Sequence, residues 1–445
     1  MLSYKKHITS TLTLAVPVII GQLGLIMMGV VDSLMVGELG ADYLAAAALA
    51  NHVVILILII GLGVSMAVTP LVAISIGAGK RDETQVLFKQ SLIVNSAFGV
   101  IMTILIFIGS ELIPYLNQPP LVVKYASSYT KILAISIIPW MIYQSYKQFI
   151  EGLSITKPPM VVTIIANIVN AFVNWVLIFG NLGFPKLELD GAGIATSSSR
   201  IFMVLVLILY VNRSKRFKEF DLSLIIKKID HFMIKKILRL GLPSGFQYFF
   251  EVGAFSFAVV MVGWLGAKSL AAHQIAINLA SISFMAVTGI SAAGGIRVGN
   301  AVGKADIKET RRAGFSAIIL GASIMFCAGM IFIFLRNYLP SLYISDKDVI
   351  SIASSLLVIA ALFQLSDGTQ AVGIGILRGL TDVKAPTLIT FIAYWIIGLP
   401  IGYVLGFVLK FGVQGVWIGL LIGLTASALM LSLRFHFKSR HRVIT

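Results

Sequence analysis

The chain has 445 residues, of which 58% are hydrophobic and only 12% are charged, with a formal net charge of +16 at pH 7. A soluble protein of this length carries roughly a quarter charged residues, so the composition excludes an ordinary soluble domain and predicts an all-α, multi-pass membrane protein. Twenty-seven of the 35 Lys and Arg residues fall in alternate loops and in both tails, which predicts cytoplasmic termini and excludes nucleic acid as the reason for the positive charge.

Twelve apolar runs are long enough to cross a bilayer, which takes about 20 helical residues. The short alternating segments of a β-barrel are missing from the sequence. The first run is too long for the core of a signal peptide, so we expect it to be retained. A single cysteine, Cys327, excludes an intrachain disulfide and a multi-thiolate metal site. The predicted spans are 10–36, 46–76, 90–110, 125–146, 159–180, 191–211, 240–266, 270–296, 313–335, 349–377, 385–409 and 411–433.

The first six spans hold one acidic side chain, Asp32, toward the outer end of the first span. Asn170 and Asn174 lie one turn apart on the fifth span, and Thr196 lies on the sixth. Carboxylate, amide and hydroxyl oxygens suit a Na⁺ site or a proton-binding network, with ordinary hydrogen bonds between helices as the alternative. Arg200, well inside the sixth span, is expected to neutralise an acid or to bind a backbone carbonyl.

A basic linker at 212–239 divides the twelve spans into six and six, and the two halves resemble each other. Because six is even, both halves enter the membrane from the same side, as in transporters built from parallel repeats. The sequence predicts two pseudo-symmetric six-helix lobes, at 1–211 and 240–445, that rock about a central cleft. The recurring pairs are Pro17 with Pro243, Val36-Gly37-x-Leu39-Gly40 with Val262-Gly263-x-Leu265-Gly266, Leu44-Ala45-Ala46 with Leu270-Ala271-Ala272, and Gly152-Leu153 with Gly379-Leu380.

Two acidic residues stand alone in long apolar stretches of the second half. Glu251 follows Arg239 by 12 residues on the seventh span, and Asp367 precedes Arg378 by 11 residues on the tenth. At a rise of about 1.5 Å per residue, both carboxylates lie roughly 16–18 Å above the inner face, near the centre of the bilayer. A lone carboxylate at that depth is costly, and its presence predicts that it binds or moves something.

If the seventh and tenth spans are in contact, the two carboxylates cannot both remain ionised cheaply in a medium of low dielectric constant. Such a pair takes up H⁺, or is neutralised by Na⁺ or by a cationic substrate, and an ion pair with Arg or Lys is the alternative. Phe255, one turn beyond Glu251, belongs either to the core or to a surface that stacks on an organic cation. Gln274 and Asn278, one turn apart on the eighth span, either contact substrate or join helices.

At these residues the chain resembles the multidrug and toxic compound extrusion (MATE) family, in particular its bacterial NorM-like branch. The resemblance covers essentially the whole chain, including the repeat and the linker. The matching stretches are Val31-Asp32-Ser-Leu-Met-Val-Gly37, Leu44-Ala-Ala46, Ala272-His273-Gln274-Ile-Ala-Ile-Asn278, and Gly375-Ile-Leu-Arg378-Gly379-Leu-Thr-Asp382 followed by Pro386.

The resemblance implies twelve helices in two lobes that form a V, and export of organic cations against inward Na⁺ or H⁺. Glu251 and Asp367 resemble the acids of the NorM-like branch, and Asp32 with its two asparagines resembles the family's polar cluster in the N-terminal lobe. Phe363 departs from the pattern, because some Na⁺-coupled members have Tyr there. The choice between Na⁺ and H⁺ therefore stays open.

The leading prediction is a secondary active multidrug antiporter that exports cationic drugs or dyes, acts as a monomer in the bacterial cytoplasmic (inner) membrane, and needs no cofactor beyond its coupling ion. A flippase for lipid-linked saccharides is the alternative, but an anionic substrate would favour a cleft lined by Arg and Lys. A membrane-embedded enzyme is not expected, because no His-Glu or Asp-Asp cluster with ligand spacing occurs. A passive channel would lack saturable, gradient-dependent flux.

Overall fold

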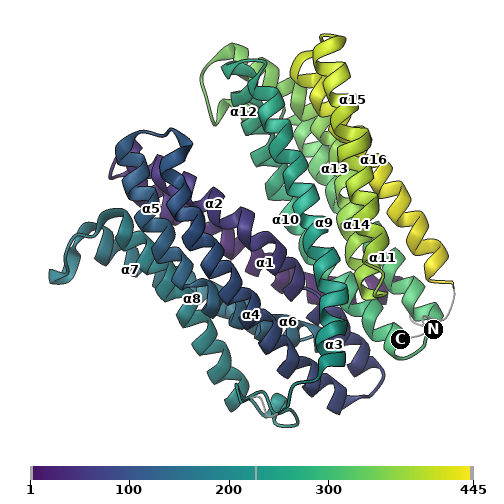
Figure 1. Cartoon of the computed structure of the whole chain (residues 1–445). Coiled ribbons are helices and arrows are strands. Elements are labelled where there is room, and N and C mark those ends of the chain that lie inside the picture. The colour runs from purple at the N-terminus through teal and green to yellow at the C-terminus, as the bar shows by residue number, and fades with distance from the viewer. Residues whose placement is uncertain (1–3, 226–227, 441–445) are drawn as a thin grey trace. The chain divides into compact units, whose positions relative to one another are not determined.

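The computed structural model describes residues 4–225 and 228–440, and these residues form helices and no strands (Figure 1). Most helices are longer than the predicted apolar spans, because their first turns contain polar residues that the spans do not include. In the first half they are α1 (Tyr4–Gly37), α2 (Ala41–Ser65), α3 (Val68–Gly77), α4 (Arg81–Leu112), η1 (Ile113–Leu116), α5 (Pro120–Ile135), α6 (Ile137–Gly152), α7 (Lys157–Phe179), η2 (Asn181–Gly183), α8 (Glu188–Arg213) and η3 (Lys215–Phe217).

The second half begins with α9 after an irregular segment and contains two π-helical stretches. Its elements are α9 (His231–Gly263), α10 (Ala267–Gly303), α11 (Ile307–Phe334), α12 (Tyr338–Ser341), α13 (Lys347–Gly379), α14 (Lys384–Phe391), the π-helix η4 (Ile392–Gly398), α15 (Leu399–Tyr403), the π-helix η5 (Val404–Val408) and α16 (Gly412–Lys438).

Among the described residues, eleven helices are long and apolar enough to cross a membrane. A twelfth span follows if α5 and α6, which are bent by 43° at Ser136, count as one. The chain is thus a multi-pass membrane protein, and the prediction of an all-helical fold is confirmed. The ends of the predicted spans differ from the ends of the helices, because only the part of a helix inside the hydrocarbon core of the bilayer has to be apolar.

The helices form two compact units, each with its own hydrophobic core. The N-unit comprises Ile20–Ile76 and Lys80–Gly245, and the C-unit comprises Met1–Ile19, Gly77–Gly79 and Phe246–Thr445. The helices α1 and α9 each contribute residues to both units. The first part of α1, up to Ile19, belongs to the C-unit, and the first part of α9, up to Gly245, belongs to the N-unit. The lobes predicted at 1–211 and 240–445 differ from the units at these stretches.

In the C-unit, α13 is the central helix and packs against α10, α11 and α16. The approach of α10 to α13 depends on small residues, because a Cβ atom on Gly375 would collide with the backbone and side chain of Ser291. Ser291 in turn donates a hydrogen bond to the carbonyl of Ala371 at 2.6 Å. Close helix packing of this kind is how membrane helices associate without a hydrophobic driving force. It also holds the acidic residue of α13 in a fixed position.

Candidate functional site

The structure brings the two isolated acids of the second half into one buried site in the C-unit. Glu251 on α9 has an exposed fraction of 8%, and Asp367 on α13 one of 4%. A hydrogen bond to Glu251 from Gln370, three residues after Asp367 on α13, places the two acids in the same region of the C-unit. Among the described residues neither forms a salt bridge, although the charge of Arg378 also acts on Glu251. This geometry favours a site that accepts a cation over a permanently paired acid.

Two residues that the sequence analysis did not single out complete this site. The Nε2 atom of Gln370, on α13, donates to Oε1 of Glu251 at 3.1 Å and to the hydroxyl of Tyr394 at 2.8 Å. Gln370 and Tyr394 are both fully buried. Gln370 lies three residues after Asp367, and an amide in an apolar span was a signal available in the sequence. Tyr394, on η4, carried none, because a tyrosine in a span is commonplace.

Aromatic rings form one side of the site. The ring of Phe255 lies 5.7 Å from that of Tyr394 and 6.1 Å from that of Phe363. Phe363 packs in turn 5.8 Å from Trp417 of α16, whose indole Nε1 donates to Nδ1 of His273 at 3.0 Å. Phe255 is half-buried, whereas Phe363 is buried. The partly open ring of Phe255 is therefore the face of this cluster that a flat cation can reach.

Gln274 and Asn278 do not join the two acids. They lie on an exposed face of α10 and bond to each other, with Nε2 of Gln274 donating to Oδ1 of Asn278 at 3.2 Å. Exposed amides on a membrane helix face water or a partner group more readily than lipid. Their predicted contact with substrate stays a prediction.

In the N-unit the predicted polar cluster is assembled around Asp32. Asn174 donates to Oδ1 of Asp32 at 2.5 Å, and the hydroxyl of Thr196 donates to Oδ2 at 2.9 Å. Nδ2 of Asn174 also lies 3.3 Å from Oδ1 of Asn170. The helices α1, α7 and α8 thus meet at one carboxylate, and all three polar partners are buried. Asp32 itself is only half-buried.

Arg200 lies next to this cluster and stabilises the break between α5 and α6. Its Nη1 donates to the hydroxyl of Ser136 at 2.8 Å, and its guanidinium lies 5.5 Å from the ring of Trp140. The charge also acts on Asp32 and on the buried hydroxyl of Tyr129. Arg200 thus acts on the charge of Asp32 from a distance and binds the buried hydroxyl of Ser136 at a helix break, in place of the backbone carbonyl expected from the sequence.

The donors in both clusters are carboxylate, amide and hydroxyl oxygens, which suit hard cations and protons rather than soft transition metals. Within residues 4–225 and 228–440, no group of three or more His, Cys, Asp or Glu side chains has the geometry to hold a metal ion. Each cluster has a single carboxylate or a pair, so its charge matches a monovalent ion or an organic cation better than a divalent one.

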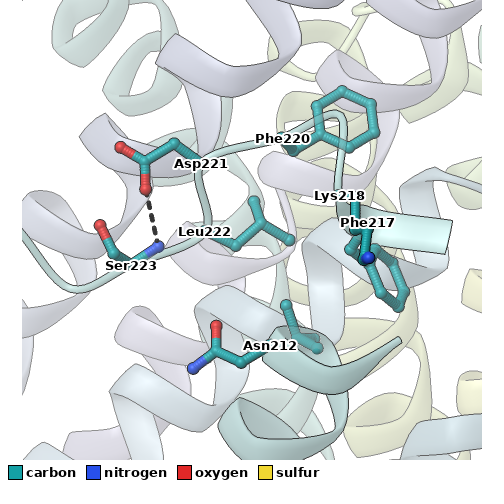
Figure 2. A pocket seen from close by; sticks show the side chains of 8 residues that line it. Asn212, Phe217, Lys218, Phe220, Asp221, Leu222 and Ser223 are labelled. Atoms are coloured by element: carbon teal, nitrogen blue, oxygen red, sulfur yellow. Dashed lines mark hydrogen bonds between the residues drawn. The ribbon is translucent and has the colours of Figure 1, made fainter. Parts of the chain in front are cut away.

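A small cavity of about 170 Å³, lined by residues of neither cluster, lies at the end of α8 and in the segment that follows (Figure 2). There the backbone N–H of Ser223 donates to Oδ1 of Asp221 at 3.1 Å, and Nζ of Lys89 lies 3.2 Å from the same oxygen. The hydroxyl and N–H of Ser223, together with Lys89, lower the pKa of Asp221 to about 2. These contacts fix the segment to α4 and give it a structural role.

Comparison with known proteins matches this chain along nearly its full length. The MatE family model matches residues 17–176 and 243–404, two copies that begin 226 residues apart like Pro17 and Pro243. Multidrug resistance protein NorM of Vibrio vulnificus (strain YJ016) is 34% identical over 441 residues, which are 98% of this chain and 97% of that protein. Multidrug resistance protein MdtK of Pectobacterium atrosepticum is 34% identical over 445 residues, 99% of this chain and 97% of that protein.

Solved structures share the fold at lower sequence identity. A MATE protein in the bent conformation superimposes with a TM-score of 0.90 at 21% identity, over 98% of this chain and 96% of that one. The eukaryotic MATE transporter AtDTX14 superimposes with a TM-score of 0.87 at 21% identity, over 99% of this chain and all of the other. The architecture predicted from the sequence is the fold of these transporters.

Proposed function

Because the chain belongs to the MatE family, as its motifs predicted, we propose that it is a secondary active multidrug efflux antiporter. It exports organic cations in exchange for inward Na⁺ or H⁺ across a bacterial cytoplasmic membrane, with both termini in the cytoplasm. The relatives named multidrug resistance proteins support this substrate class. The observation that carries the proposal is that Glu251 and Asp367 are both buried in the C-unit, where Gln370, three residues after Asp367 on α13, donates a hydrogen bond to Glu251.

The mechanism follows from competition for this pair. In a site of low dielectric constant, two neighbouring carboxylates are stable only when a positive charge or a proton neutralises one of them. A cationic drug supplies that charge on one side of the membrane, and Na⁺ or H⁺ supplies it on the other. Since the drug and the coupling ion both bind Glu251 and Asp367, binding of the coupling ion releases the drug. The reciprocity of binding free energies then couples the two fluxes.

Other residues take supporting roles in the proposal. Phe255 stacks on the flat part of the substrate, and Gln274 and Asn278 contact it from the exposed face of α10. Oxygen atoms of Asp32, Asn170, Asn174 and Thr196 form a second site for the coupling cation or proton in the N-terminal half. The lobes 1–211 and 240–445, joined by the linker at 212–239, rock about a central cleft in a monomer that needs no cofactor beyond the coupling ion.

Transport of a fluorescent organic cation tests the proposal directly. Purified protein in liposomes should export an ethidium-like dye when a Na⁺ or pH gradient is imposed, and should stop when the gradient is dissipated. Glu251→Gln and Asp367→Asn should each abolish gradient-driven export, although both variants should still fold. Asp348→Asn is the matched control, because Asp348 lies on the same helix α13 but is exposed and paired with Lys268.

Substitution of the two acids decides between coupling and passive flux. If Glu251→Gln and Asp367→Asn exported dye at the rate of the wild type, the shared-carboxylate mechanism would be wrong. Dye flux in the wild type that did not depend on either the Na⁺ or the pH gradient would instead indicate a channel. Repeating the assay with Na⁺ present and absent at fixed pH separates the two coupling ions.

A further inference from the structure

Two glutamates that the exchange mechanism does not use occupy equivalent places in the two halves of the chain. Glu83 is the third residue of α4 and Glu309 is the third residue of α11, and they lie 226 residues apart, the spacing of the internal repeat. The threonine that follows each glutamate, Thr84 or Thr310, donates from its hydroxyl to the backbone carbonyl four residues earlier. Sequence and local structure therefore repeat at these two positions.

Each glutamate faces a basic side chain on the first helix of the other half. Nζ of Lys236, on α9, donates to Oε1 of Glu83 at 3.0 Å. Nε2 of His7, on α1, lies 3.7 Å from Oε2 of Glu309. Each contact lies within one unit, because the first part of α9 belongs to the N-unit and the first part of α1 belongs to the C-unit. We call Glu83 with Lys236 the α9 clamp.

At the start of α1, the guanidinium of Arg297 on α10 makes the strongest contacts. Its Nη1 donates to the carbonyl of His7 at 2.6 Å and to Oγ1 of Thr11 at 2.7 Å. Its Nη2 lies 2.7 Å from Nδ1 of His7 and 3.6 Å from Oε1 of Glu309. His7 and Thr11 are fully buried. Arg297 and Glu309, together with His7 and Thr11, form what we call the α1 clamp.

The contact with Arg297 determines the protonation state of His7 in the α1 clamp. A guanidinium only donates hydrogen bonds, so Nδ1 of His7 must accept, and the imidazole is neutral with its hydrogen on Nε2. A second proton on His7 would place an N–H group against the guanidinium at 2.7 Å. The hydrogen bond would then be lost and two positive charges would be in contact. The neutral imidazole is therefore the form that holds α1 to α10.

The other charged groups near His7 do not reverse this preference. Glu309 attracts a protonated imidazole, whereas Arg297 of α10 and Arg312 of α11 repel it. The carboxylate of Glu309 is farther from the imidazole than the guanidinium is, and it is half-buried, so solvent weakens its attraction. Burial of the imidazole itself also disfavours the charged form. The charged neighbours on α1 itself are Lys5 and Lys6.

The α9 clamp has no group of this kind. It pairs an ammonium with a carboxylate, and histidine is the side chain whose charge ordinarily changes between pH 5 and 8. We propose that these repeat-related contacts clamp the first turns of α1 and α9, and that mild acid releases only the α1 clamp. A proton taken from solvent by Nδ1 of His7 breaks the bond to Arg297, so the start of α1 detaches from α10 more often. Only the assignment of this response to cytoplasmic pH rests on the proposed function.

Hydrogen exchange of the purified protein, measured by mass spectrometry at pH 7.5 and pH 5.5, tests the release without any transport. Exchange rates are corrected for the pH dependence of an unprotected amide and converted to opening equilibrium constants. A detached imidazole has the ordinary pKa of about 6.5, whereas a clamped one stays neutral. The opening constant of residues 8–12 should therefore rise about tenfold from pH 7.5 to pH 5.5. That of residues 235–239 of α9 should change by less than about twofold.

Three substitutions make the comparison specific to His7. His231→Asn is present in every protein of the series, because His231 is exposed in the first turn of α9 and would add a titration of its own there. His7→Asn places Oδ1 where Nδ1 accepts from Arg297 and gains no proton in this range, so the rise at residues 8–12 should disappear. His436→Asn is the matched control, because His436 is a half-buried histidine of α16 in the same unit. It should leave the tenfold rise unchanged.

The outcomes separate this inference from the proposed function. A rise of less than about twofold at residues 8–12 of the parent protein overturns the release of α1, even if His7→Asn does not fold. A rise that persists in His7→Asn, or that disappears in His436→Asn, overturns the role of His7. An equal rise at residues 235–239 would show general loosening by acid and would overturn the selective release. Failure of dye export contradicts the proposed function but leaves the exchange result to decide the inference.

Discussion

The bond between Trp417 and His273 offers a quantitative test of how the C-unit is held together. The indole Nε1 of Trp417 donates to Nδ1 of His273 at 3.0 Å, and both side chains are buried. Trp417→Phe removes the donor and leaves Nδ1 of His273 without a partner, which costs about 1–3 kcal/mol. Lost ring atoms add about 1 kcal/mol, at about 0.8 kcal/mol for each buried CH₂-sized group. We expect Trp417→Phe to lower stability by about 2–4 kcal/mol.

The combined variant carries the decisive information. His273→Leu leaves the indole N–H without an acceptor, at a similar cost of about 1–3 kcal/mol. In the double variant neither polar group remains, so its destabilisation should be smaller than the sum of the single effects by both of these costs together, about 2–6 kcal/mol. Unfolding in detergent, followed by helical circular dichroism over a range of denaturant concentrations, measures all four proteins.

A distant tryptophan provides the control for this cycle. Trp175 on α7 is exposed and belongs to the N-unit. The effects of Trp175→Phe and His273→Leu should therefore add to within about 0.5 kcal/mol. If Trp417→Phe and His273→Leu were equally additive, the bond would contribute nothing measurable and the reasoning from unsatisfied buried groups would fail here.

Three other predictions concern different parts of the chain. Thr196→Val removes one hydrogen bond to Asp32 without changing the shape of the side chain. If H⁺ is the coupling ion at this site, half-maximal efflux should need about tenfold less H⁺, and if Na⁺ is the coupling ion, it should need more Na⁺. Efflux from liposomes measured at increasing concentrations of each ion distinguishes the two results. The pKa of Asp221 lies below its ordinary value of 3.8, at about 2. The ionised carboxylate therefore stabilises the linker above about pH 4, and this stabilisation is lost as the pH falls toward 2. Hydrogen-exchange protection of the linker should show this loss in the wild type but not in Asp221→Asn. Gly375→Ala should cost about 1–3 kcal/mol by overpacking and lower the melting temperature, whereas Gly29→Ala, with open space around it, should not.

Much of the fold could be read from the sequence, because a bilayer imposes its requirements one helix at a time. A run of about 20 apolar residues crosses the hydrocarbon whatever surrounds it, and the positions of Lys and Arg indicate its direction. The spans and the internal repeat could therefore be predicted without knowing any contact between helices. The isolation of Glu251 and Asp367 was equally visible, since the cost of a buried charge depends on depth more than on neighbours.

Only the tertiary structure decided which side chains touch. The sequence places Glu251 and Asp367 at one depth, but the packing of α13 in the C-unit brings them into the same region. Gln370 and Tyr394 became part of the site because α13 and η4 meet there, and no periodicity in either segment indicates that contact. Gln274 and Asn278, which looked equivalent to the N-terminal asparagines, lie on an exposed face of α10 instead.

The physical reason is the same in each case. Hydrophobicity and charge act on a residue through the average medium around it, so a sequence reveals where a side chain can reside. Hydrogen bonds and pairwise repulsion act over a few ångströms and depend on how two helices are rotated about their axes. That rotation is set by the small residues through which the helices pack, such as Gly375, and so appears only once the whole unit has folded.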